Sequence, residues 1–119
     1  MLRRLFLVAP IVLAFVWLGC DTPPLVEMVN AESALSNARS GYAKKYAKDE
    51  LESAEVALQK AREEMAFQQG RLSVMRNYDS ADTLLAYARV LTQTAEDSAK
   101  LRREVALANA EHELQVLTE

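Results

Sequence analysis

One cysteine and one histidine are the side chains of this chain best suited to nucleophilic or metal chemistry. His112 lies near the end of the chain between Glu111 and Glu113, and neighbours in sequence point to different sides of a helix. That spacing does not form a metal site. No second histidine or further thiol could complete an activated nucleophile. The chemistry of Cys20 must therefore be understood from the residues around it.

Carboxylate pairs such as Glu63 and Glu64 occur along the chain, but they predict no acid–base site. Such pairs do catalytic work where a shielded pocket separates their pKa values. A narrow seam of alanine and leucine on a helix provides no pocket of this kind. We therefore expect a protein that is not an enzyme and that holds no cofactor and no metal.

The segment before Cys20 has the layout of an export signal. Arg3 and Arg4 form a positive start, residues 5–18 carry no charge, and the small residue Gly19 precedes the cysteine. A positive region, a short apolar region and a small residue before the cut are typical of secretory signals. The apolar run is also short for a membrane span. The alternative is an uncleaved N-terminal anchor helix with an incidental cysteine.

Leu18-Gly19-Cys20 resembles the lipobox of bacterial lipoproteins, although Trp17 stands where leucine is usual. The resemblance implies that the Cys20 thiol receives a diacylglycerol and that the signal is cut before it. The predicted organisation is a signal peptide over 1–19, a lipidated tether over 20–24 and a helical domain over 25–119. Asp21 resembles the signal that retains lipoproteins of enteric bacteria in the inner membrane, which favours that membrane over the outer one.

Charge and composition limit the classes of partner and fold. Removing Arg3 and Arg4 from the 14 basic residues leaves 12 against 17 acidic ones, a net charge of −5 after cleavage. Without a basic stripe to neutralise phosphates, the chain is not expected to bind nucleic acid. Alanine is abundant, and the only glycines and prolines after the signal are Gly41, Gly70, Pro23 and Pro24. This composition predicts an all-α domain.

Apolar spacing predicts three helices, over about 25–40, 49–75 and 79–117. Gly41 is placed to end the first helix, and Asp49 with Glu52 resembles a capping box at the start of the second. Gly70 lies off the apolar seam, so we expect the second helix to continue through it. The predicted seams are Met28, Ala31, Leu35 and Ala38; Leu51, Ala54, Leu58, Ala61, Met65, Gln68, Leu72 and Met75; and Ala81, Leu84, Ala88, Leu91, Ala95 and Ser98.

A short internal repeat links the first two helices. Residues 31–39 read AESALSNAR and residues 54–62 read AEVALQKAR, with six of nine positions identical. Two copies of one packing unit would explain the match, and chance in an Ala/Glu-rich chain is the alternative. In either case both segments place small alanines beside leucine on one face, which lets helices approach closely.

Two architectures differ in what they leave exposed. If the chain folds back at 41–48, the result is a small antiparallel bundle of about three helices with a long C-terminal helix. If the first two helices are collinear, they form one long α-helical hairpin with the third. We favour folding back. Beyond about Val105 the third helix would then carry an uncovered apolar stripe, which we predict to be a protein-binding or self-association surface: Leu107, Ala110, Leu114 and Leu117.

Two further motifs carry a family resemblance. Tyr46-Ala47 with Glu50-Leu51 and the spaced Ala54, Leu58 and Ala61, followed by Asn77-Tyr78 with Ala81 and Leu85-Ala86, resemble an uncharacterised family of bacterial Ala-rich envelope lipoproteins. That family is a domain of unknown function that sometimes precedes OmpA-like domains. Lys48 stands where the family usually has proline, and the present sequence contains no OmpA-like domain, so a peptidoglycan site is not implied.

These features predict a non-catalytic, lipid-anchored protein of the bacterial cell envelope that faces the periplasm. The first hypothesis is a structural or scaffold module that binds an envelope protein or associates with itself. The second is a module that binds cell-wall fragments by stacking sugars on aromatic residues. The third is an accessory subunit of an envelope transport machine. The aromatic residues in question are Tyr42, Tyr46, Phe67, Tyr78 and Tyr87.

Overall fold

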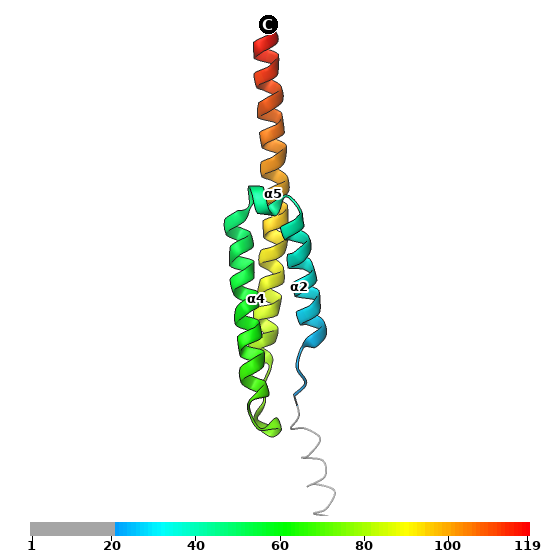
Figure 1. Cartoon of the computed structure of the whole chain (residues 1–119), viewed down its shortest axis with the longest axis vertical. Helices are drawn as coiled ribbons and strands as arrows, with labels where there is room; N and C mark the ends of the chain where they lie inside the picture. Colours follow the sequence, from blue (N-terminus) through cyan, green and yellow to red (C-terminus); the bar gives the residue numbers. More distant parts are fainter. Residues whose placement is uncertain (1–20) are drawn as a thin grey trace, which may run out of the picture.

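The computed structural model describes residues 21–119, and every regular element in this range is helical. The elements are α2 (Leu25–Ser40), α3 (Ala43–Tyr46), α4 (Lys48–Gln69), the 3-10 turn η1 (Ser73–Met75) and α5 (Asp79–Thr118). Figure 1 shows α2 and α5 running in one direction and α4 in the other. The all-α prediction is confirmed. The chain folds back between α2 and α4, so the three-helix bundle is correct and the long hairpin is not.

The fold-back lies where α2 was predicted to end. The backbone N–H of Gly41 donates to the carbonyl oxygen of Asn37 at 3.1 Å, which closes the last turn of α2. The segment that follows is not a plain connector, because Ala43 and Ala47 are buried and α3 packs against α5. Two small side chains thus allow the chain to reverse close to the third helix.

The predicted capping box at the start of the second helix is wrong. The N-cap of α4 is Ala47, whose backbone angles are φ −140° and ψ 48°, and it makes no side-chain capping bond. Asp49 instead lies in the first turn, where a carboxylate is favoured by the positive end of the helix dipole. The helix begins earlier because Ala47 must be buried against the bundle, a tertiary requirement that overrides the local signal.

The predicted passage of the second helix through Gly70 is also wrong. α4 ends at Gln69 with Gly70 as its C-cap. Two carbonyl groups released at this end, those of Gln69 and Arg71, accept hydrogen bonds from the guanidinium of Arg76 at 3.1 and 3.0 Å. Because a later side chain satisfies them, the chain turns here, and the predicted seam positions Leu72 and Met75 are exposed.

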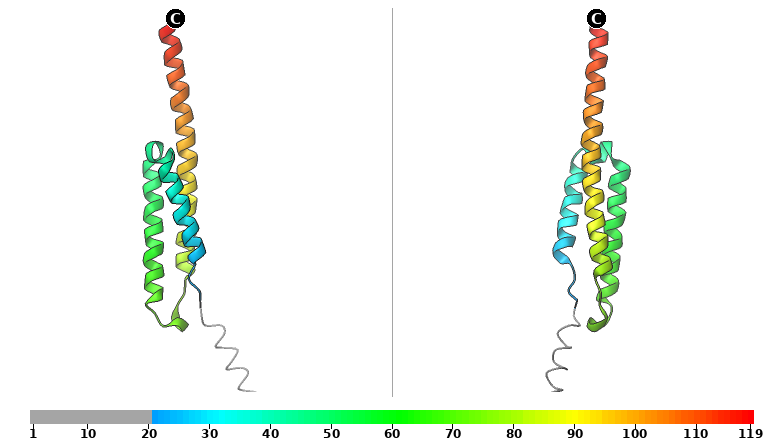
Figure 2. Two further views of the ribbon diagram at one scale, coloured as in Figure 1. Left: turned by 45° about the vertical axis from the view of Figure 1, so that its right-hand side comes forward. Right: turned by 180° about the vertical axis from the view of Figure 1, so that it is seen from behind.

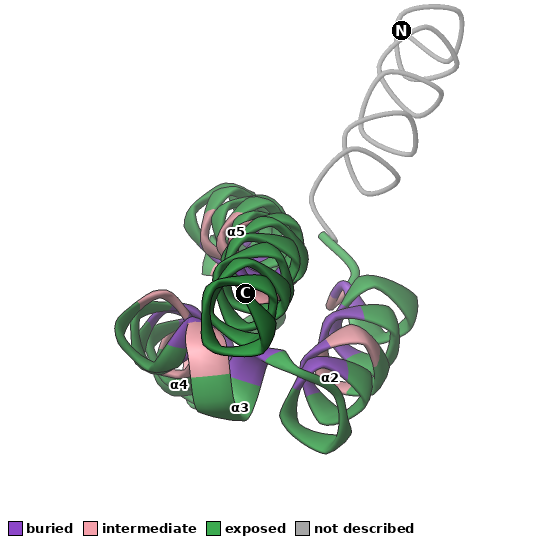
Figure 3. Cartoon of the chain, turned by 90° about the horizontal axis from the view of Figure 1, so that it is seen from above, coloured by how far each residue is buried: buried purple, intermediate pink, exposed green. Residues whose placement is uncertain are grey.

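The core lies where α2, α4 and α5 face one another, as the view along the bundle shows (Figure 3). The predicted seam of α2 is confirmed in full, and that of α4 is confirmed as far as Gln68. On α5 the buried residues repeat at steps of four and three: Ala81, Leu85, Ala88, Thr92, Ala95 and Ala99. The predicted Leu84 and Leu91 are partly buried and pack against this core, and Ser98 is also partly buried. The fully buried positions at these levels are Leu85, Thr92 and Ala99, because α5 packs against two helices and its buried face is centred between them.

The two copies of the internal repeat occupy equivalent places in α2 and α4. The first and last of the three shared alanines and the shared leucine of each copy are buried: Ala31, Leu35 and Ala38 in α2, and Ala54, Leu58 and Ala61 in α4. The shared Glu and Arg form reciprocal ion pairs between the antiparallel helices. These join Arg62 to Glu32 at 2.8 Å and Arg39 to Glu55 at 2.6 Å. Exposed pairs stabilise little, so their main effect is to favour one register of α2 against α4.

Tyr78 is fully buried at the turn into α5, and its hydroxyl has no hydrogen-bond partner among the described residues. A buried polar group without a partner costs about 1–3 kcal/mol. We therefore expect Tyr78→Phe to raise the free energy of unfolding by about 1 kcal/mol in chemical denaturation. Tyr78→Leu is the comparison, since it also removes the hydroxyl but changes the shape, and it should be less stable than Tyr78→Phe. A loss of stability in Tyr78→Phe would contradict this account.

Candidate interaction surface

α5 continues well beyond the bundle that positions it. Its last buried residue is Ala99, Arg103 is half-buried, and every residue from 104 to 119 is exposed. Figure 2 shows this part of α5 leaving the bundle alone, past α3 and away from the turn that joins α4 to α5. We call residues 104–119 the α5 extension.

Two arginines fix the point at which α5 leaves the bundle. Arg102 donates from Nη1 to the carbonyl oxygen of Tyr46 at 2.7 Å and to Oε2 of Glu50 at 3.2 Å. The guanidinium of Arg103 lies 4.2 Å from the centre of the Tyr42 ring, a cation–π contact. The hydrogen bond from Arg102 lowers the pKa of the Glu50 carboxyl, so Glu50 keeps its charge to lower pH. These contacts tie α5 to the fold-back and define where the extension begins.

The predicted stripe lies on the α5 extension and is uncovered. Leu107, Leu114 and Leu117 are 49%, 63% and 81% exposed, and Ala110 between them is exposed as well. Steps of three, four and three place all four side chains on one helix face. The core positions of α5 continue past Ala99 as Arg102, Ala106, Asn109 and Glu113, which are mostly polar. The apolar stripe is thus a second face, turned away from the seam that built the bundle.

Charge on the α5 extension has a single sign. It carries Glu104, Glu111, Glu113 and Glu119 and contains no lysine or arginine. His112 is exposed among these glutamates, and the described part of the chain holds no cluster of His, Cys, Asp or Glu suited to a metal ion. The extension therefore combines an apolar stripe with an acidic surround.

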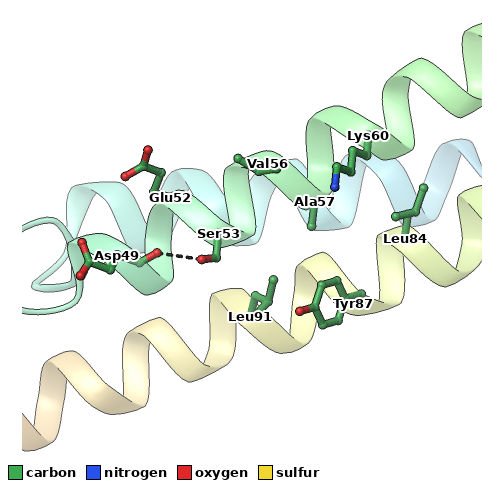
Figure 4. A pocket seen from close by; sticks show the side chains of 9 residues that line it. All are labelled: Asp49, Glu52, Ser53, Val56, Ala57, Lys60, Leu84, Tyr87 and Leu91. Carbon is green, nitrogen blue, oxygen red and sulfur yellow. Dashed lines mark hydrogen bonds between the residues drawn. The ribbon is translucent and has the colours of Figure 1, made fainter.

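The aromatic residues considered for sugar stacking do not form one surface. Tyr42 and Tyr46 lie at the fold-back, whereas Phe67 and the buried Tyr78 lie towards the opposite end of the bundle. Tyr87 is separate from both groups and lines an open groove between α4 and α5. Figure 4 shows Leu84, Tyr87 and Leu91 projecting from α5 towards α4 across this groove. Helical periodicity did not predict the groove, because Leu84 and Leu91 both pack against the core and line the groove.

The predicted lipidation residue, Cys20, lies outside the described residues. Asp21 is the first described residue, and its Oδ2 accepts a hydrogen bond from the backbone N–H of Tyr78 at 2.7 Å. The start of the described chain is thus attached to the α4–α5 turn. Within residues 21–119, none of the helices combines the length and the apolar character needed to cross a membrane.

Comparisons of the chain with family models, with curated proteins and with solved structures give no match. The resemblance to Ala-rich envelope lipoproteins therefore stays a prediction, as do the assignments of lipid, partner and compartment that follow from it.

Proposed function

We propose that this protein is a non-catalytic, lipid-anchored interaction module of the bacterial cell envelope. In this account the membrane is reached through a lipid on Cys20, and the domain faces the periplasm. The observation that carries the proposal is the α5 extension, a helix that leaves the bundle with an uncovered apolar stripe. A contiguous exposed apolar face on a helix is typical of a site that packs against another helix.

The ends of the domain suit this role. The first described residue lies at the α4–α5 turn, and the α5 extension lies at the opposite end (Figure 1). At 1.5 Å per residue, the 16 residues of the extension span about 24 Å. An anchor at Cys20 would hold the turn near the membrane and present the extension away from it.

Charge distinguishes between the two classes of partner. A second copy of this helix would bring glutamates towards glutamates with no lysine or arginine on either extension, and like charges oppose pairing. A helix of another envelope protein, with an apolar face bordered by lysine or arginine, would complement both the stripe and its surround. We therefore favour a different protein over self-association.

Replacing Leu107, Leu114 and Leu117 together with serine should remove partner binding while the bundle stays folded. These side chains are exposed, so the thermal midpoint followed by circular dichroism should stay within a few degrees of wild type. The complex recovered after chemical crosslinking in cells should disappear.

The matched control changes Val105 and Val116 to serine. Both are exposed residues of α5 that lie on the face opposite the stripe. This control should keep the crosslinked complex. Unfolding of the triple variant would show that the stripe belongs to the core. Equal loss of the complex in both variants would show that partner binding does not depend on the stripe in particular.

A further inference from the structure

The end of the bundle opposite the α5 extension carries a second apolar surface. Leu72 and Val74 are each 72% exposed, Met75 is 54% exposed, and Phe67 in the last turn of α4 is exposed as well. All four lie within or next to the turn between α4 and α5, which we call the apolar tip. Large apolar side chains gathered at one exposed turn mark a place where another apolar surface is met.

The apolar tip is held by a set of polar contacts. Gln68 is buried, and its Oε1 accepts hydrogen bonds from the backbone N–H of Asn77 at 2.9 Å and from Arg71 at 3.3 Å. Arg76 closes the other side of the turn by donating to the carbonyl oxygens of Gln69 and Arg71. The polar atoms of the turn thus bond one another, and its apolar side chains remain outside.

The apolar tip lies where the chain enters the domain. The carboxylate of Asp21 binds the backbone N–H of Tyr78, at the end of the same turn. Asp21 directly follows Cys20, the predicted lipidation residue. A lipid there would hold the membrane surface within a few residues of the tip. Figure 2 shows the turn and the start of the described chain at the same end, away from the C-terminus.

Charge near the tip is divided between two sides. Residues 69–78 include Arg71 and Arg76 and no acidic residue. The carboxylates of this end lie outside the turn, at the start of the described chain, in the first turns of α2 and α5, and at Glu64 of α4, which accepts a hydrogen bond from Gln68. Partial desolvation is the main reason that the pKa of the Asp82 carboxyl is raised, and the nearby carboxylates of Glu27, Asp21 and Asp79 raise it further. The turn itself is therefore apolar and basic, the combination that favours a surface with anionic lipid headgroups.

We propose that the apolar tip is a membrane-contact site that inserts Leu72, Val74 and Met75 into the headgroup region of the bilayer. The inference rests on the proposed lipid anchor at Cys20. The tip adds a second contact close to the lipid, and together the two orient the bundle with the α5 extension away from the membrane. The ligand is a bilayer surface that contains anionic lipids.

The test uses the processed chain purified from cells with any lipid it carries. An environment-sensitive fluorophore is attached through Val74→Cys, or through Val90→Cys or Leu117→Cys as controls at exposed positions on α5. The protein is reconstituted into phosphatidylethanolamine–phosphatidylglycerol vesicles that contain spin-labelled lipid. The label at position 74 should shift to shorter wavelength and lose most of its emission to the spin label, while both controls remain unquenched. Adding Leu72→Asp and Met75→Asp should abolish quenching at position 74.

Mass spectrometry of the same samples distinguishes failure of the membrane-contact proposal from failure of the proposed lipid anchor. A lipid adduct on Cys20 with a water-exposed label at position 74 would overturn the apolar tip and leave the proposed anchor intact. Absence of any adduct would remove the anchor, and with it the inference that depends on it.

Discussion

Leu58→Ala is expected to lower the free energy of unfolding by about 2–5 kcal/mol, the usual cost of truncating a buried leucine. Leu58 is 1% exposed and is among the largest fully buried side chains of the described bundle. Small domains have only about 5–15 kcal/mol of stability, so this one change should remove a large share. Thermal and denaturant unfolding followed by circular dichroism measures it.

Two comparison variants make this result specific. Val56→Ala removes apolar atoms from an exposed position two residues away and should change stability by less than about 0.5 kcal/mol. Ala61→Leu adds atoms where the side chain is completely buried and should cost about 1–3 kcal/mol through overpacking. Wild-type stability in both Leu58→Ala and Ala61→Leu would contradict the packing of α4 described above.

Cys20→Ser is expected to abolish lipid attachment completely and to leave the precursor uncut. The predicted modification forms a thioether on the cysteine sulfur, and a serine hydroxyl is not the acceptor in that chemistry. A single acyl chain holds a protein only marginally, whereas two provide stable anchoring. Without the thiol no acyl chain is attached, so Cys20→Ser should incorporate no label when cells are fed a tagged fatty acid.

Thr22→Ser serves as the control for Cys20→Ser, because it makes a small change two residues later and leaves the thiol in place. It should incorporate the tagged fatty acid as wild type does. Equal labelling of wild type and Cys20→Ser would end the lipoprotein proposal. The bundle and the α5 extension would remain, but their orientation relative to a membrane would lose its basis.

The sequence predicted an element correctly where the apolar spacing and a helix-breaking residue indicated the same boundary. The limits of α2 and the exposed stripe at Leu107, Leu114 and Leu117 follow from helical periodicity and helix length. The fold-back was favoured because Gly41 and the Asp49 cap both indicated a break, and of these two signals the structure keeps only the end of α2 at Gly41. Helix length mattered most for the stripe. The third helix is longer than the second, so part of it cannot be covered once the first helix folds back.

The predictions that failed depend on contacts between distant residues. Nothing local to Gly70 shows that Arg76 will bind the carbonyl groups at the end of α4. Ala47 likewise is buried in the core formed by the packed helices, and α4 begins directly after it in place of the Asp49 signal.

For the internal repeat, too, the sequence predicted part of the structure and tertiary contacts decided the rest. Its matching letters were visible in the sequence, but the reciprocal pairs between Glu32 and Arg62 and between Arg39 and Glu55 required the antiparallel arrangement. Periodicity therefore predicted which faces are buried, and tertiary contacts decided where the helices begin and end.

Photocrosslinking in cells tests the proposal that the α5 extension binds a different envelope protein. A photoreactive amino acid is placed at Leu107, Leu114 or Leu117, and at Val105 or Val116 as controls on the opposite face. We expect one adduct, of this chain with a different protein, from the three stripe positions and not from the two controls. Adducts of this chain with itself from the stripe, or equal crosslinking from both faces, would contradict it.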